Sequence, residues 1–325
     1  MPTLTYRDAL RQALIDEMDR DPEVFLIGED IGRYQGTFRV TQGLFDKYGK
    51  DRVIDAPITE PGFTGMAVGA AMVGLRPVVE MMTMSFSILA LDQVINSAAK
   101  VHSMTGGQAS VPMVIRGPGG HANQLSAQHS HSLEGWYAHV PGLKVVVPAT
   151  PADAYGMLKT AIRDDNPVIF TENPGLYALK GEVPTESGDF TVPFGKARIA
   201  REGTDVTLVA YSRMVSVCEA AADLLEKDGI SAEVVDVRSL LPLDTETIYA
   251  SIQKTNRAVV VYEDWRSGGF GAEIAARIGE ECFDSLDAPV GRVGGLNVPT
   301  PYSRVLELEC IPNEHDVVAA VRKIG

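Results

Sequence analysis

A carboxylate beside a run of small residues is the first feature that could do chemistry. Glu60 lies in the segment DAPITEPGF (55–63), at the start of the small-residue run GFTGMAVGAAMVG (62–74). At the N-terminus of a helix, Glu60 could simply complement the helix dipole. A carboxyl packed against apolar neighbours such as Ile58 would instead have a raised pKa, which suits proton transfer. The residues alone leave both interpretations open.

A histidine-rich segment is the second feature. The stretch RGPGGHANQLSAQHSHSLEGWYAHVP (116–141) holds four of the six histidines, which are His121, His129, His131 and His139. Segments of this length without regular structure are often functional. One of these histidines could act as a general acid or base near neutral pH. A metal site, with Glu134 as the nearby carboxylate, and a set of ordinary loop histidines are the alternatives.

The third feature is the glycine-rich stretch SGGFGAE (267–273), which lies between a predicted strand and a predicted helix. It is similar to a turn that cradles phosphate, but it lacks the G-x-G-x-x-G spacing. We therefore expect a tight turn there. A nucleotide-binding regulatory module would depend on this stretch alone.

These residues are embedded in apolar runs that alternate with helical patterns, which is typical of α/β folds with mainly parallel sheets. In the first half we predict helices over 5–20, 62–74, 85–102 and 151–163, and strands over 24–27, 77–81, 111–115, 144–147 and 167–171. In the second half we predict strands over 206–210, 232–237 and 258–262, and helices over 215–228, 271–281 and 313–323. The predicted organisation is a domain over 1–175, a connection over 176–204 and a domain over 205–325.

Composition limits the classes of partner. The 325 residues suit two domains, and 43 acidic against 29 basic residues give a net charge of −14, which disfavours nucleic acids and anionic membranes. No run is long and apolar enough to span a membrane, and residues 1–20 lack the apolar centre of a signal peptide. The three cysteines lie far apart, which fits a reducing compartment. We expect a cytoplasmic protein.

Several longer segments resemble one known family. They are FLIGEDIG (25–32), RVIDAPITEPGFTGMAVGAAMVGLRPVVE (52–80), LDQVINSAAK (91–100), the segment 141–170 and LDAPVGRVGGLNVPTPY (286–302). Together they resemble the beta subunit of the thiamin-diphosphate-dependent decarboxylase component of 2-oxoacid dehydrogenase complexes, most closely the pyruvate type. The resemblance implies an N-terminal pyrimidine-type domain of the transketolase superfamily and a smaller C-terminal α/β domain of the transketolase C-terminal type.

The resemblance also implies roles for single residues. Glu60 matches the acid that contacts N1′ of the cofactor's aminopyrimidine ring and stabilises the imino tautomer, whose 4′-imine takes the proton from thiazolium C2. Phe86 matches the ring that packs on the pyrimidine, Ile58 would line the same pocket and Glu29 matches an acid near it. His129 matches the histidine proposed for acid–base work during acyl transfer to lipoamide. The family often reads HSQ where this chain reads His129-Ser130-His131, and we favour His129.

Ion sites and partners follow from the same resemblance. A potassium site in related subunits matches Met113, Ala161, Ile162, Asp164 and Asn166. The chain has no Gly-Asp-Gly motif, which the family uses to hold the diphosphate and Mg²⁺. The resemblance therefore implies a separate alpha chain that holds this half of thiamin diphosphate, in an α2β2 assembly, with the helix over 62–74 as a subunit contact.

The expected activity is oxidative decarboxylation of pyruvate followed by reductive acetylation of a lipoyl group. Branched-chain 2-oxo acids, acetoin or a non-catalytic structural homologue are the alternatives. Expected partners are the lipoyl domain and the peripheral-subunit-binding domain of the dihydrolipoyl acyltransferase. Acids such as Asp284, Asp287 and Glu307 could meet basic residues of the latter domain, or could be an ordinary solvated surface.

Overall fold

The computed structural model describes residues 1–121, 124–187 and 189–325, and these residues form two units. Unit 1 comprises Met1–Gly119 and Trp136–Phe194, and unit 2 comprises Gly120–Gly135 and Gly195–Gly325. Part of the histidine-rich segment therefore packs with the C-terminal part of the chain. Residues 122–123 of that segment and residue 188 of the predicted connection lie outside the described residues. The predicted domain boundaries stay a prediction.

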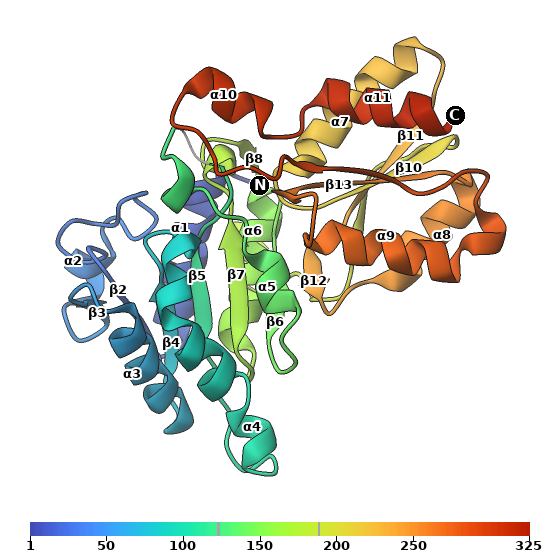
Figure 1. Ribbon diagram of the computed structural model, residues 1–325. Coiled ribbons are helices and arrows are strands. Elements are labelled where there is room, and N and C mark those ends of the chain that lie inside the picture. Colours follow the sequence, from blue (N-terminus) through green and yellow to red (C-terminus); the bar gives the residue numbers. More distant parts are fainter. Residues whose placement is uncertain (122–123, 188) are drawn as a thin grey trace. The chain divides into compact units, whose positions relative to one another are not determined.

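Unit 1 is built on a parallel sheet whose strands lie in the order β6-β7-β5-β4-β2-β3 (Figure 1). The strands are β2 (Val24–Gly28), β3 (Val53–Asp55), β4 (Arg76–Glu80), β5 (Val114–Pro118), β6 (Lys144–Val146) and β7 (Val168–Glu172). Three of them, β2, β5 and β7, are buried at every residue, as expected for parallel strands covered on both faces. The direction of chain progression reverses between β2 and β4. In open α/β sheets, ligands bind beyond the carboxyl ends of the strands at such a point.

Helices cover both faces of this sheet. Figure 1 shows α3 (Glu60–Met72) in front of the strands and α1 (Tyr6–Arg20) behind them, where α1 packs with α6 (Pro151–Arg163). Thr5 and Thr150 are the N-caps of α1 and α6, because each accepts a hydrogen bond from the backbone N–H three residues later, at 3.1 Å. Unit 1 also contains β1 (Thr3–Thr5), α2 (Leu44–Tyr48), β8 (Lys180–Glu182) and the short helix η4 (Pro174–Leu176).

The single helix predicted over 85–102 is wrong. The chain instead forms a 3-10 helix, η1 (Met84–Ala90), a π-helix, η2 (Gln93–Ala98), and a short α-helix, α4 (Val101–Met104). Hydroxyl side chains compete with regular helical hydrogen bonding here: Ser85 N–H donates to Thr83 Oγ1 at 2.9 Å, and Ser87 Oγ donates to the Met84 carbonyl at 2.5 Å. The strand predicted over 111–115 is shifted toward the C-terminus in β5.

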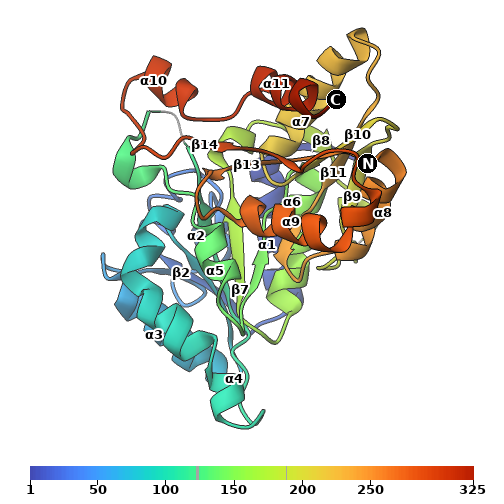
Figure 2. The same ribbon diagram turned by 45° about the vertical axis from the view of Figure 1, so that its right-hand side comes forward.

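Unit 2 is built on a sheet with the strand order β14-β13-β10-β11-β9, parallel except for the edge strand β9. The strands are β9 (Arg198–Arg201), β10 (Val206–Ala210), β11 (Ala232–Asp236), β13 (Ala258–Trp265) and β14 (Gly291–Gly295). Figures 1 and 2 show α7 (Met214–Lys227) and α11 (Glu314–Ile324) on one side of the strands, and α8 (Thr245–Thr255) and α9 (Phe270–Glu281) on the other. The remaining elements are η3 (Ala127–His129), α5 (Glu134–Ala138), η5 (Thr185–Ser187), β12 (Ser239–Leu241), η6 (Phe283–Ser285) and α10 (Arg304–Glu309).

The α/β class with mainly parallel sheets is confirmed. The sequence patterns missed α8, α10 and the edge strands β9 and β14, of which β14 reads Gly-Arg-Val-Gly-Gly and carries almost no hydrophobic signal. The tight turn predicted ahead of α9 is confirmed, with Gly268 at φ +79°. Within the described residues, no helix combines the length and hydrophobicity needed to cross a membrane.

Candidate functional site

Two buried carboxyl groups lie at the point where the sheet of unit 1 reverses. Glu29 directly follows β2, Glu60 is the first residue of α3, and they are 7% and 5% exposed. Burial raises the pKa of Glu29 to about 6, with smaller contributions from the negative charges of Glu60 and Asp30. Within the described part of the chain, the buried Oε1 atom of Glu29 has no hydrogen-bond partner. Such an atom is costly unless a ligand completes it.

Hydrogen bonds from β3 fix the loop that carries Glu29. The carboxylate of Asp55, at the end of β3, accepts from Gly32 N–H at 2.6 Å and from Arg33 N–H at 3.0 Å. Ala56 N–H donates to the Gly28 carbonyl at 2.8 Å. The side chain of Glu29 is therefore positioned by two adjacent strands, which suits a preorganised site.

A buried ion cluster lies at the same edge of the sheet and was not predicted. Arg116 in β5 donates two hydrogen bonds to Glu172 at the end of β7 and one to Glu80 at the end of β4. Tyr177 donates to Glu172 at 2.7 Å. Burial raises the pKa of Glu80, and the Arg116 guanidinium opposes that shift. Arginine within the apolar run VIRGP was the signal that could have revealed this cluster.

The other two residues expected around the pyrimidine differ in exposure. Phe86 is half-buried in η1, whereas Ile58 is 80% exposed although it lies two residues before the buried Glu60. This chain by itself therefore places Glu29, Glu60 and Phe86 in protected positions and leaves Ile58 on its surface.

The residues matched to a potassium site lie at the C-terminal end of α6 and at the strands beside it. The carbonyls of Met113 and Ala161 each accept one backbone hydrogen bond, and Arg76 donates to the carbonyls of Ile162 and Asp164 at 3.0 and 3.1 Å. The Asp164 carboxylate is bound by Lys144 and accepts from Asn166. A cation there would have to use the second lone pairs of the carbonyl oxygens.

The part of the histidine-rich segment that carries His121, His129 and His131 belongs to unit 2, whereas His139 belongs to unit 1. His129 ends η3, and both His129 and His131 are half-buried. The His131 ring lies 5.8 Å from the Trp265 ring, and burial, followed by the charges of His129 and His121, lowers its pKa. A cavity of about 470 Å³ is lined by Ala127, His131, Trp265, Ser267, Asn297, Val298 and Pro299. The preference for His129 over His131 stays a prediction.

Long-range contacts hold the histidine-rich segment on unit 2. His121 N–H donates to Glu263 Oε1 at 2.6 Å, and Gln124 N–H donates to Glu307 Oε1 at 2.9 Å. Gln124 and Ser126 both have φ +65°, a strained backbone region for residues other than glycine. The expectation that Glu307 meets a partner's basic residues is wrong, because its carboxylate is fully buried and bound within the unit. Asp284 and Asp287 are exposed.

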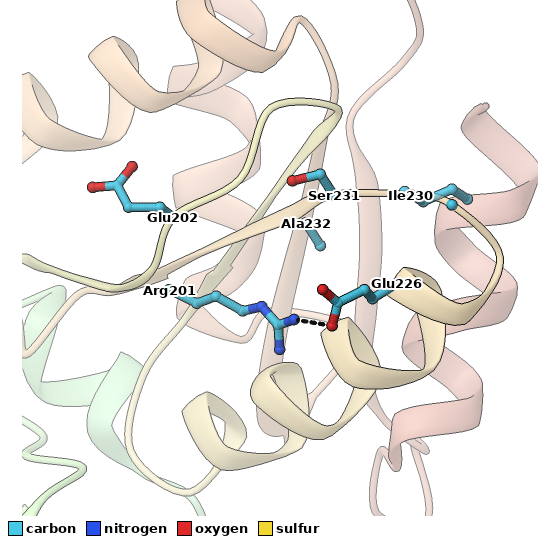
Figure 3. Close-up of a pocket in the computed structure, with 7 residues that line it drawn as sticks. Arg201, Glu202, Glu226, Ile230, Ser231 and Ala232 are labelled. Carbon is cyan, nitrogen blue, oxygen red and sulfur yellow. Dashed lines mark hydrogen bonds and ion pairs between the residues drawn. The ribbon is translucent and has the colours of Figure 1, made fainter.

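A second cavity of unit 2, of about 340 Å³, lies away from these residues (Figure 3). Arg201 points across it toward Glu226, with which it forms an ion pair at 2.9 Å. None of the predicted site residues lines this cavity. Among the described residues, no group of three or more His, Cys, Asp and Glu side chains could hold a metal ion. The three cysteines are free and buried.

Comparisons with known proteins identify the family. Residues 2–180 match the transketolase pyrimidine binding domain, and residues 195–317 match the transketolase C-terminal domain. A solved structure described as "Split gene transketolase, inactive beta4 tetramer" has a TM-score of 0.80 and 26% sequence identity, and the match covers 99% of this chain and 98% of that one. The predicted two-part transketolase-type fold is confirmed.

Curated relatives are much more similar in sequence. Pyruvate dehydrogenase E1 component subunit beta-2, mitochondrial, of Oryza sativa subsp. japonica is 54% identical over 322 residues, covering 98% of this chain and 86% of that protein. Pyruvate dehydrogenase E1 component subunit beta of Rickettsia felis is 51% identical, covering 99% of this chain and 98% of that protein. The mitochondrial subunit beta of Bos taurus is 50% identical, with 98% and 90% covered. With half of its residues identical to such proteins over nearly its full length, the chain belongs to the family of pyruvate dehydrogenase E1 component beta subunits.

Proposed function

We propose that this chain is the beta half of a pyruvate dehydrogenase decarboxylase component and is active only together with an alpha chain. The proposed reaction is the thiamin-diphosphate-dependent oxidative decarboxylation of pyruvate, with reductive acetylation of a lipoyl group on the acyltransferase. The buried carboxyls Glu29 and Glu60, at the reversal point of the sheet, are the observation that carries the proposal. Membership of the family supports it.

The residues of unit 1 fit the aminopyrimidine half of the cofactor. When bound, thiamin diphosphate supplies a nucleophilic ring carbon that attacks the 2-oxo acid. The Glu60 carboxyl would share a proton with the ring nitrogen N1′, and its burial strengthens such a hydrogen bond. The unpaired Oε1 of Glu29 would accept a hydrogen bond from the same ligand, while Phe86 offers an apolar face.

The diphosphate and Mg²⁺ belong, on this proposal, to an alpha chain in an α2β2 assembly. This chain has no Gly-Asp-Gly motif to hold them. The exposed Ile58 beside the buried Glu60, together with Met66 and Met72 exposed on α3, supports a site that another chain covers. His129 lies on a segment that hydrogen bonds attach to unit 2, and it would serve as the acid or base during acyl transfer.

The first test is pyruvate decarboxylation by the chain alone and mixed with its alpha chain, with thiamin diphosphate and Mg²⁺ present. We expect activity only in the mixture, and a loss of about 10²- to 10⁴-fold for Glu60→Gln. Glu23→Gln is the matched control, since Glu23 is exposed and lies at the opposite end of β2. Activity of the chain alone, or full activity of Glu60→Gln in the mixture, would overturn the proposal.

Substrate choice is tested in the same mixture. If the enzyme is instead specific for branched-chain 2-oxo acids or for acetoin, that substrate should give a higher kcat/KM than pyruvate does. A non-catalytic homologue would leave every mixture silent while still assembling with the alpha chain.

We further propose a cytoplasmic location. Free, buried cysteines support a reducing compartment.

We also propose potassium binding at the carbonyls around Asp164. Binding of potassium predicts a higher Tm in KCl than in NaCl at equal ionic strength, since an ion bound only by the folded state stabilises it. Equal Tm values in the two salts would remove the potassium proposal.

A further inference from the structure

A buried pair of acids joins the histidine-rich segment to the sheet of unit 2. Glu134 is 5% exposed, and Asp264, near the end of β13, is 4% exposed. Asp264 Oδ1 accepts a hydrogen bond from Trp265 N–H at 2.7 Å. A Cβ atom placed on Gly135 would lie 3.3 Å from Asp264 Oδ2 and 3.3 Å from the backbone nitrogen of Phe270, the first residue of α9. Gly135, the residue after Glu134 in the histidine-rich segment, thus packs directly against Asp264.

The charges around this pair do not neutralise it. Glu263 is a third buried acid: Arg213 Nε lies 3.4 Å from its Oε2, and His121 Nδ1 lies 3.3 Å from its Oε1. His121 also faces Asp264 and partly opposes the rise in the pKa of that carboxyl. The phenol of Tyr211 lies beside Glu134. Among the described residues, no lysine or arginine forms an ion pair with Glu134 or Asp264. If both were ionised, these two buried carboxylates would therefore repel each other.

Protonation removes that repulsion. Burial raises the pKa of both carboxyls, and the charge of Asp264, followed by that of Glu263, raises the pKa of Glu134 further. Because the folded unit holds these protons more tightly than an unfolded chain does, this packing is most stable at low pH. It weakens as the pH rises through the raised pKa values.

We propose that Glu134 and Asp264 share a proton and act as positioning residues that hold the segment carrying His129 in place. The inference rests on the proposed role of His129, which lies five residues before Glu134. Loss of the shared proton leaves two buried carboxylates, loosens residues 124–135 and displaces the acid–base group. Deprotonation of the pair would therefore lower the activity at alkaline pH.

The kinetic test compares pH profiles of kcat/KM for the assembled enzyme from about pH 6 to about pH 9. Glu134→Gln keeps the shape and the hydrogen-bonding capacity of the protonated acid, so we expect it to retain activity near neutral pH. Its activity should also fall less at alkaline pH, because the variant has no shared proton to lose. Glu134→Ala is expected to lower kcat about tenfold or more at every pH. The control is Glu273→Gln, an exposed acid of α9, which should follow the unaltered enzyme. An unchanged alkaline limb in Glu134→Gln would overturn the proposal.

A second test needs no activity and so separates this inference from the proposed function. The chain has two tryptophans, and Trp136→Phe leaves only Trp265, which adjoins Asp264 and contacts the His131 ring. In that background we expect a pH-dependent change in Trp265 fluorescence that Glu134→Gln and Asp264→Asn each abolish. The same transition in all three proteins would contradict the shared proton, whatever the enzyme assays show.

Discussion

The buried acids at one edge of the unit 1 sheet are accommodated in two different ways. Glu80 and Glu172 share the guanidinium of Arg116, so that charges brought into the interior are compensated. Within the described residues no ion pair joins Glu29 to a cation, and burial raises its pKa to about 6. A site that binds a ligand through a carboxyl keeps this kind of uncompensated group, at a cost to the stability of the free chain.

This cost predicts a pH-dependent effect of Glu29→Gln. The pKa of Glu29 is about 6 in the folded chain against an ordinary 4.5, so the folded state loses stability as the carboxyl ionises between these values. We expect the variant to have a higher Tm than the unaltered chain above about pH 6, and a similar Tm below about pH 4.5. Thermal unfolding across this range checks it, and a difference in Tm that is independent of pH would contradict it.

Arg116→Met predicts a large loss of stability. The substitution leaves Glu80 and Glu172 buried without their cation, which costs about 3–5 kcal/mol in the free energy of unfolding. Arg201→Met is the matched control, because Arg201 pairs with two well-exposed acids and should cost under about 1 kcal/mol. Urea unfolding of both variants measures the two losses in unfolding free energy. Similar losses would contradict the claim that burial makes the Arg116 cluster more important for stability than an exposed ion pair.

At the scale of elements, the helix N-caps were predictable from the sequence, whereas the irregular helices and the edge strands were not. The caps at Thr5 and Thr150 could be predicted because a cap depends on residues three positions apart. The irregular run of η1 and η2 could not, since apolar periodicity does not register how serine and threonine hydroxyls redirect backbone hydrogen bonds. The edge strands carried too few apolar residues to produce a pattern.

Helix α9 offers a matched pair of glycine substitutions. A Cβ atom at Gly271 would lie 2.0 Å from the Tyr262 ring, so Gly271→Ala should cost about 1–3 kcal/mol in unfolding free energy. A Cβ atom at Gly279 meets nothing within 4 Å, so Gly279→Ala should stabilise the chain by about 0.5–1 kcal/mol. Urea titration measures both values, and effects of the same sign would contradict this account of α9.

For the whole molecule, the net charge of −14 favours basic partners over nucleic acids and anionic membranes. Glu307 is buried and cannot meet a basic domain, whereas Asp284 and Asp287 are exposed in unit 2. Docking of a basic domain would use the exposed acids through complementary charge, which mainly raises the association rate and depends on salt.

Asp287→Lys tests this docking in the proposed α2β2 assembly. If the peripheral-subunit-binding domain docks there, its affinity for the enzyme should fall at least about tenfold, as expected for a reversed charge at an interface. Glu186→Lys makes the same charge change at an exposed position of unit 1 and should have little effect. Equal affinities of the two variants, measured by calorimetry, would remove Asp287 from the interface.

The sequence by itself determined the α/β class, most buried strands, the capped helices and the position of Glu60 at the start of a helix, because these depend on short-range periodicity and local hydrogen bonds. Only the tertiary structure decided that residues 120–121 and 124–135 pack with the C-terminal part of the chain. It also brought Arg116 to Glu172 and Glu134 to Asp264, pairs that are 56 and 130 positions apart. Neither pairing leaves a local pattern, since the energies that select it are the burial and compensation of charge across the folded chain.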